Sequence, residues 1–352
     1  MNLEKKNFKI SIVTPVYNCE GYLNEFFDSV LNQTYKGFFL YVVNDCSTDR
    51  TREIIKQYED RFEGRLIYLE SKENSGQSVS RNIALDEIAK WPTEYLTFLD
   101  ADDWIEEDYL KDLYDAAIKE DADLTISGLH RFDDETGKEI CVEMISFPEN
   151  KITKLYEFDG FGRMNTCLYC KLFRYEKVKD VRFRVMGRSE DTCYVFETLP
   201  LMGSAKFTNH AYYHYRVRKS SLSGFGNDNI SKSMYEQFGN MLKKYENEPY
   251  KDFIDLLETQ IFIRSAVGGV CRDSFKSMKK AKKYENICRR FMDENMPSWR
   301  KNPYLSLRKG LSGGMKANAL KVCTLLYKMH MFILFVWAYY FMSQVLKKDV
   351  RA

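Results

Sequence analysis

The sequence predicts an α/β fold with a mostly parallel sheet and helices on both faces, followed by a helical C-terminal region. Two observations support this prediction. Apolar, β-rich segments alternate strictly with segments of helical periodicity over residues 9–127. From about residue 228 to 295 the pattern is helical, without a strong strand signal.

The expected strands are rich in β-branched and aromatic residues, and they cover residues 9–14, 38–43, 65–69, 95–99 and 124–127. The expected helices share an apolar spacing of about 3.6 residues, and they cover residues 22–31, 50–62, 76–89 and 109–121. Residues 38–43 (FFLYVV) are apolar throughout, which is typical of a strand covered on both faces. Ligands bind beyond the carboxyl ends of such strands, so the polar residues found there are the first candidates for a site.

Three carboxylates, those of Asp100, Asp102 and Asp103, follow the fourth expected strand directly. Their mutual repulsion costs free energy unless a cation offsets it. Oxygen ligands at a strand end suit Mg2+ or Mn2+, with phosphate groups completing the coordination. The alternative is a helix N-terminus, where Asp side chains favour the helix dipole. The segment alone favours a metal site.

Two further segments are weaker signals. Asp45 stands just after the second expected strand, where a carboxylate can accept from a base or a ribose hydroxyl. For this residue alone an Asx turn is the favoured explanation. In residues 76–82 (GQSVSRN), Gly76 permits close approach to a ligand, and Arg81 can bind phosphate through its planar guanidinium. This is not a nucleotide-binding loop of the GKS or GKT type.

Four segments occur together in the order and spacing of the family 2 glycosyltransferases, namely residues 14–18 (TPVYN), 43–49 (VNDCSTD), 76–82 (GQSVSRN) and 99–103 (LDADD). The chain resembles this family over roughly residues 8–225. The resemblance implies the nucleotide-sugar-binding, Rossmann-like fold called GT-A. It also implies transfer of one sugar from a nucleotide diphosphate, usually UDP, with inversion at the anomeric carbon. Cys46 stands where glycine is usual, which bears on the turn geometry but removes no ligand.

The resemblance also implies roles for single residues. It assigns nucleotide-sugar binding to Pro15, Tyr17, Asp45, Arg81 and Asp100. It assigns the metal, Mn2+ or Mg2+, to Asp102 and Asp100, with Asp103 supporting the acceptor or the metal ligands. Inversion needs a general base, and residues 187–192 (GRSEDT) resemble the Glu-Asp motif of the family. Asp191 is then the base, with Glu190 as its catalytic neighbour; without the family, an Asp capping a helix at residues 193–199 is the favoured interpretation.

Residues 210–221 resemble the family segment that closes over the donor. The resemblance places Arg216, Arg218, Ser220 and Ser221 on the diphosphate and offers His214 as a further metal ligand. The residues by themselves predict an aromatic strand with a solvated basic end, and for His214 this remains the favoured interpretation.

Charge is distributed unevenly along the chain. Residues 276–352 hold 17 basic and 4 acidic residues, whereas the rest of the chain is net acidic, so an anionic partner is expected for this part. Residues 329–346 contain no Asp, Glu, Lys or Arg, and this length is at the lower end of a bilayer span. Basic residues flank both sides, which favours an interfacial or re-entrant helix on an anionic membrane surface. The alternative is a core helix packed on the catalytic domain or on a second copy. No nucleic-acid-binding motif is present.

These observations predict a metal-dependent, inverting glycosyltransferase that moves one hexosyl or N-acetylhexosaminyl group from a UDP-sugar to a hydroxyl of a lipid-linked glycan, in bacterial cell-envelope polysaccharide synthesis. The N-terminus lacks a signal peptide and the nine cysteines are irregularly spaced, so we expect a cytoplasmic protein, peripheral on the inner face of the cell membrane. The expected parts are a GT-A domain over residues 1–225, a helical region over 226–298, and a membrane-associating or oligomerising tail over 299–352. The alternatives are a nucleotidyltransferase and a catalytically silent scaffold subunit of a glycan-synthesis complex.

Overall fold

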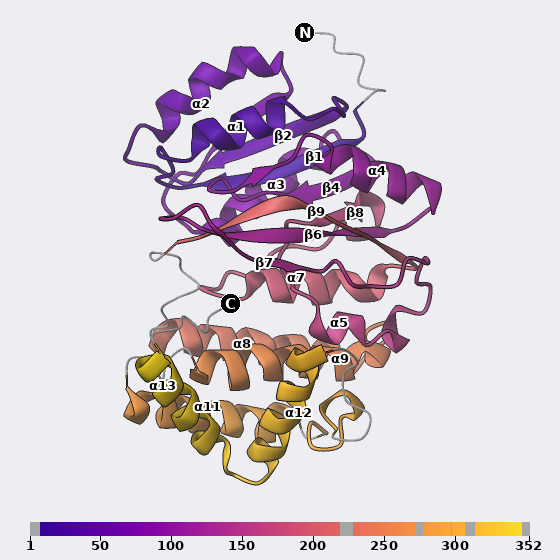
Figure 1. Cartoon of the computed structure of the whole chain (residues 1–352). Helices are drawn as coiled ribbons and strands as arrows, with labels where there is room; N and C mark the ends of the chain where they lie inside the picture. Colours follow the sequence, from indigo (N-terminus) through magenta and orange to yellow (C-terminus); the bar gives the residue numbers. More distant parts are fainter. Residues whose placement is uncertain (1–7, 219–227, 272–276, 297, 307–313, 347–352) are drawn as a thin grey trace. The chain divides into compact units, whose positions relative to one another are not determined.

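A computed structural model describes residues 8–218, 228–271, 277–296, 298–306 and 314–346 (Figure 1). The chain forms two compact units. The first consists of Met1–Leu155 and Asn165–Arg218, and the second of Tyr156–Met164 and Lys219–Ala352. The three-part division expected from the sequence stays a prediction.

The first unit contains one mixed, mostly parallel sheet. Its strands are β1 (Ile10–Val16), β2 (Phe38–Asn44), β3 (Leu66–Glu70), β4 (Tyr95–Phe98), β5 (Trp104–Ile105), β6 (Leu124–Asp133), β7 (Glu139–Glu143), β8 (Lys171–Arg174) and β9 (Ala205–Val217). The order across the sheet is β3-β2-β1-β4-β8-β6-β9-β5, and β7 pairs with β6. β3, β2, β1 and β4 are parallel, whereas β8 runs antiparallel between β4 and β6.

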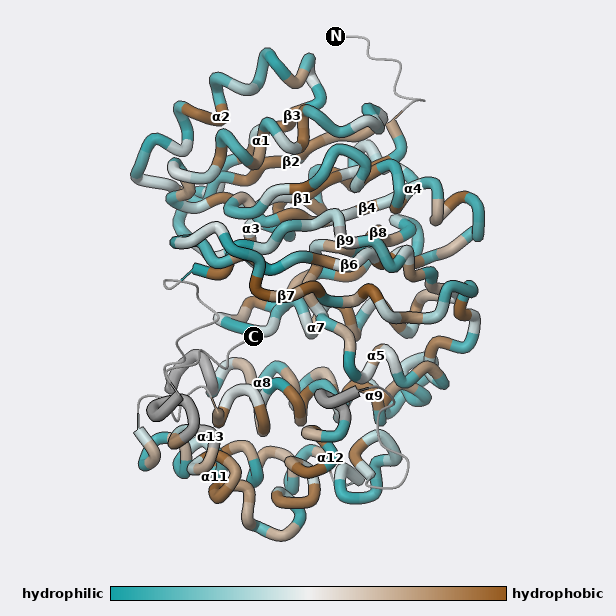
Figure 2. The backbone as a smooth tube through the Cα atoms, viewed as in Figure 1, coloured by the Kyte–Doolittle hydropathy of each residue, from teal (hydrophilic) through white to brown (hydrophobic). Residues whose placement is uncertain are grey.

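Helices cover this sheet on both faces, as Figure 1 shows. Those of the first unit are α1 (Leu23–Leu31), α2 (Thr51–Glu59), α3 (Gln77–Ile88), α4 (Tyr109–Lys119), α6 (Tyr175–Val178) and α7 (Glu190–Thr198). α1 has one apolar face, which is buried in the first unit. This face consists of Leu23, Phe26, Phe27 and Val30. β2 is buried along almost its whole length and is brown in Figure 2, in agreement with a strand covered on both faces.

Register brings the ends of the parallel strands together. Val16 is paired with Asn44, and Val13 with Phe98, so β1, β2 and β4 finish at the same edge of the sheet. The segments that follow these strands therefore meet at that edge. These are the segments in which the sequence predicted the site.

The second unit is helical in its described parts. Its helices are α5 (Gly160–Arg163), α8 (Asp228–Lys244), α9 (Ile254–Ile261), a π-helical segment (Phe262–Gly269), α11 (Met278–Asn295), α12 (Gly314–Lys328) and α13 (Phe332–Leu346). In its core the Phe262 ring contacts those of Trp299 and Tyr327, and all three residues are buried. A search of the described helices found none with the length and apolar character needed to cross a membrane.

Candidate active site

The turn after β2 is organised by Asp45. Its buried carboxylate accepts hydrogen bonds from the backbone N–H groups of Ser75, at 3.0 Å, and Gly76, at 2.7 Å. Gly76 precedes α3 with φ +84°, a conformation that favours glycine. Cys46 holds a left-handed backbone, φ +58°, where the family has glycine, and the turn forms nonetheless. In this structure, Asp45 therefore connects two loops of the candidate nucleotide site.

Pro15 and Tyr17 lie at the neighbouring strand end. Pro15 is the sixth residue of β1, and Tyr17 follows the strand directly with 46% of its surface exposed. An exposed ring at this edge is available to stack on a nucleobase.

The acidic cluster after β4 separates into one buried and two accessible carboxylates. Asp103 is buried; it accepts hydrogen bonds from the Tyr213 hydroxyl at 2.6 Å and the Arg216 backbone N–H at 2.8 Å. Burial, together with the charges of Asp102 and Asp100, raises the pKa of Asp103 well above its usual range. The side chains of Asp100 and Asp102 are 29% and 20% exposed. These two carboxylates, which the sequence assigned to the metal, are the accessible pair.

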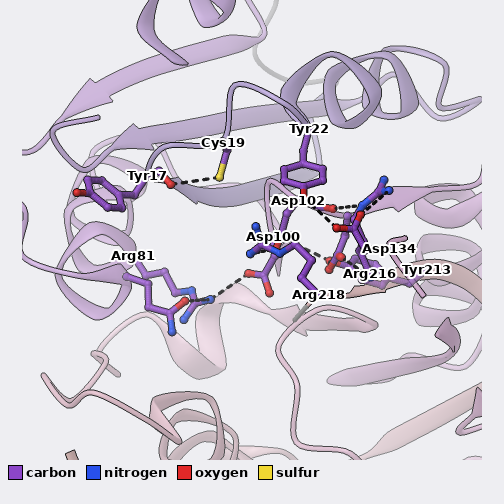
Figure 3. A network of polar contacts seen from close by, with 12 residues as sticks. Tyr17, Cys19, Tyr22, Arg81, Asp100, Asp102, Asp134, Tyr213, Arg216 and Arg218 are labelled. Carbon is purple, nitrogen blue, oxygen red and sulfur yellow. Dashed lines mark hydrogen bonds and ion pairs between the residues drawn. The ribbon is translucent and has the colours of Figure 1, made fainter. Parts of the chain in front are cut away.

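Arg216 is engaged with the chain on every side of its guanidinium (Figure 3). Nε donates to the Asp102 carbonyl at 2.8 Å, and the Nη atoms contact Glu25 at 2.6 Å and Asp134 at 3.5 Å. Together with its backbone bond to Asp103, these contacts fix the turn that carries the accessible pair. The placement of Arg216 on the diphosphate stays a prediction.

Arg218 lies closer to the accessible carboxylates. Its guanidinium forms an ion pair with the Asp102 carboxylate and lies 5.2 Å above the Tyr22 ring. The pair neutralises part of the charge on a candidate metal ligand, and the placement of Arg218 on the diphosphate stays a prediction. Ser220 and Ser221, which the sequence assigned to the same diphosphate, lie outside the described residues.

Glu190 and Asp191 form the first turn of α7, where the helix dipole favours negative charge. The buried Glu190 carboxylate accepts from Arg81 at 3.0 Å and from Gln77 at 2.5 Å. Burial and the charge of Asp191 raise the pKa of Glu190, and Arg81 opposes this shift. The contacts of Glu190 therefore favour a supporting role over the catalytic one expected from the sequence.

Asp191 is less buried than Glu190. Its Oδ1 accepts from the Thr192 backbone N–H at 2.6 Å, a contact within its own helical turn. The Thr192 hydroxyl is 2.8 Å from the Thr166 hydroxyl, so the turn is fastened to the loop before β8. Burial and the charges of Asp102 and Asp191 raise the pKa of Asp100, whereas Arg81 opposes this shift.

His214 lies in a stack of aromatic rings. Its ring is stacked between Trp104, at 4.9 Å, and His130, at 5.3 Å, and its Nε2 is 3.0 Å from the Glu106 carboxylate. Burial lowers the pKa of His214, although Glu106 opposes this shift. The expectation that His214 binds a metal gains no support from these contacts.

The donor groups at the edge of the sheet suit a divalent cation. Within the described ranges, no group of three or more His, Cys, Asp or Glu residues is arranged to hold a metal. Two accessible carboxylates completed by phosphate oxygens are, however, a ligand set that Mg2+ and Mn2+ take. The residues present fit the ion.

A parallel sheet edge with accessible carboxylates and an acid at the start of a helix is typical of a nucleotide-dependent group transferase. The profile of "Glycosyl transferase family 2" matches residues 11–182. A Haemophilus influenzae protein, described as an uncharacterized glycosyltransferase, is 32% identical over 215 residues, which cover 61% of this chain and 81% of that protein. The chain belongs to glycosyltransferase family 2 and is a glycosyltransferase.

Two further comparisons agree with this assignment. Glycosyltransferase GlyA of Streptococcus pneumoniae is 33% identical over 226 residues, which cover 61% of this chain but 31% of GlyA, so the match spans less than a third of that protein. The crystal structure of Staphylococcus aureus TarS 1–349 with UDP-GlcNAc aligns with a TM-score of 0.70 over 98% of this chain and 93% of that one. At 19% identity this likeness concerns the fold, and it confirms the predicted GT-A architecture followed by a helical region.

Proposed function

We propose that this protein transfers one sugar from a UDP-sugar to a hydroxyl of a glycan acceptor, with inversion and with Mn2+ or Mg2+. The observation that carries the proposal is that one guanidinium, that of Arg81, contacts both Asp100 at the sheet edge, at 3.1 Å, and Glu190, which precedes Asp191 at the start of α7, at 3.0 Å. The complex of TarS with UDP-GlcNAc supports the donor class.

The proposed roles follow from the positions of the side chains. Tyr17 offers its exposed ring to the uracil, and Pro15 and Asp45 line the same strand ends. Asp191 takes the proton of the acceptor hydroxyl at a carboxylate oxygen while that hydroxyl attacks the anomeric carbon. Asp100 and Asp102 would hold a divalent cation, which would stabilise the negative charge on the departing UDP.

The acceptor is proposed to be a cell-envelope glycan, either lipid-linked or polymeric. TarS carries the description poly(ribitol-phosphate) beta-N-acetylglucosaminyltransferase, and its matched segment is 35% identical to this chain over 106 residues. Transfer to such a polymer at the inner face of the membrane would bring a basic helical unit near anionic lipid.

The proposed function is tested by measuring UDP release from a panel of UDP-sugars, with Mn2+ and with EDTA. We expect one donor to release UDP in Mn2+ and to stop in EDTA. Release of pyrophosphate in place of UDP would identify a nucleotidyltransferase. A purified chain that turns over none of the panel would support the scaffold alternative.

We also propose that α13 is the part of the chain that binds an anionic membrane. One side of this helix packs Phe332 and Val336 into the second unit. The other side exposes Leu334, Trp337 and Phe341, with exposed fractions of 55%, 59% and 54%. The helix has no charged residue, while residues 276–352 are strongly basic. An exposed apolar face with this charge around it fits the interface of an anionic bilayer.

Replacement of Leu334, Trp337 and Phe341 together by Ser is expected to abolish co-sedimentation with phosphatidylglycerol vesicles, because it removes the apolar anchor. The wild-type chain should sediment with these vesicles and less with phosphatidylcholine vesicles. Val185→Ser, which changes an exposed apolar residue of the first unit, is the control and should bind as the wild type does. If the wild type binds neither kind of vesicle and forms a dimer, and the triple variant is a monomer, then a second copy of the chain covers this face.

A further inference from the structure

Arg81 is a buried cation that joins two acidic segments far apart in the sequence. It lies on the inner side of α3, and its side chain is 4% exposed. Nη1 is 3.0 Å from Glu190 at the start of α7, and Nη2 is 3.1 Å from Asp100 after β4. The Phe183 ring lies under the guanidinium at 5.3 Å. One side chain thus connects the segment proposed to bind the metal with the helix that carries the proposed base.

This connection depends on the shape of the guanidinium. Its donors point in fixed directions in one plane, so a single Arg can hold two separate carboxylates at a set spacing. A lysine ammonium is a point charge on a flexible chain and cannot impose that spacing. Gln77, one turn earlier on α3, donates to the same Glu190 oxygen and also accepts from Arg81, which closes the cluster.

Glu190 is the hydrogen-bond acceptor in this connection. Its side chain is 6% exposed, and its Oε1 already accepts two hydrogen bonds, from Arg81 and Gln77. A carboxylate held in this way does not reach an acceptor hydroxyl. Its neighbour Asp191 is more exposed, and its Oδ1 accepts from the backbone N–H and the hydroxyl of Thr192, at 2.6 and 3.3 Å.

We propose that Arg81 and Glu190 are positioning residues, which fix the first turn of α7, and with it Asp191, at a set place relative to Asp100. This inference rests on the proposed function. It gives Arg81 a role different from nucleotide binding and gives Glu190 a role different from acid–base chemistry. Displacement of a catalytic group by about 1 Å can cost roughly 10²-fold in rate, so the pair would act on turnover more than on donor binding.

The first test is Arg81→Lys, with three measurements. We expect kcat to fall roughly 10- to 100-fold. The Kd for UDP with Mn2+, measured by calorimetry, should change by less than about 3-fold, which corresponds to less than about 0.7 kcal/mol of binding free energy. We also expect faster hydrogen–deuterium exchange at residues 187–195, because the first turn of α7 loses its tether.

Substitutions at Glu190 separate positioning from catalysis. Glu190→Gln keeps an oxygen that accepts from Arg81 and Gln77, so its kcat should stay within roughly 10-fold of the wild type, less than loss of a general base or acid costs. Glu190→Ala removes the acceptor and should resemble Arg81→Lys in both kcat and exchange. Glu197→Gln is the matched control, because Glu197 is also a buried α7 carboxylate held by an arginine, Arg184, at 2.6 Å. It should lower the melting temperature without changing kcat or the exchange of residues 187–195.

The outcomes are distinct. An Arg81→Lys variant whose UDP affinity falls as much as its kcat would make Arg81 a donor-binding residue and overturn the inference. A loss of 10³-fold or more in Glu190→Gln would make Glu190 a catalytic residue and also overturn it. If the wild type turns over no UDP-sugar, the proposed function fails, and unchanged exchange in Arg81→Lys would then show that the pair does not hold α7 either.

Discussion

Asp191→Asn is expected to lower the rate of sugar transfer roughly 10²- to 10⁴-fold, the usual contribution of a general base. The amide oxygen of Asn can still accept from the Thr192 N–H, so the first turn of α7 should keep its structure. The amide cannot take a proton from the acceptor, and this alone accounts for the expected loss. The measurement is kcat together with the Kd values for UDP and Mn2+, which should match those of the wild type.

Glu197→Gln serves as the control for this prediction as well, because it changes a carboxylate on the same helix six residues further on. Its turnover should equal that of the wild type. An Asp191→Asn enzyme with unchanged turnover would remove Asp191 from the mechanism. Such a result would leave the capping interpretation, which the residues alone favour, as the explanation of this aspartate.

Asp102→Asn is expected to abolish the stimulation of UDP binding by Mn2+ and to lower kcat roughly 10²- to 10³-fold, which corresponds to the several kcal/mol that a metal ion supplies to a leaving phosphate. The reason is that Asp102 is one of two accessible carboxylates at the sheet edge, and the other, Asp100, is also held by Arg81. The variant also frees Arg218 from its ion pair, so UDP binding without metal should be retained or improved.

Asp123→Asn is a suitable control for Asp102→Asn. Asp123 stands just before β6, at the opposite edge of the same sheet, where its carboxylate holds Arg174 at 2.7 Å and the Gly203 N–H at 2.7 Å. Its loss should lower the melting temperature and leave the Mn2+ dependence of UDP binding intact. Equal Mn2+ dependence in Asp102→Asn and the wild type would contradict a metal site at this edge.

The strands and helices of residues 9–127 could be predicted from the sequence because buried parallel strands are apolar runs and the helices between them have one apolar face. The strands β7 and β8 could not. β8 is four residues long and begins with Lys171, which is fully buried because its ammonium donates to the carbonyls of Asn165 and Cys167. Hydropathy cannot identify a buried lysine that is satisfied by backbone carbonyls.

In the candidate site too, some residues could be predicted from the sequence and others could not. Asp45, Asp100 and Asp102 were predictable because they directly follow parallel strands that end at one edge. The partners that hold the site, such as Tyr22, Glu25 and Asp134, come from distant segments and carry no local signal. The same holds for His214, because its stacking partners Trp104 and His130 come from other strands.

The most direct test of the central claim is the anomeric configuration of the first sugar released from an α-linked UDP-sugar, followed by proton NMR before mutarotation. If the chain is an inverting transferase with Asp191 as base, the donor identified in the UDP-release panel should give UDP and the β-anomer in Mn2+, and Asp191→Asn should slow the appearance of both. Release of the α-anomer, or of pyrophosphate, would contradict the account.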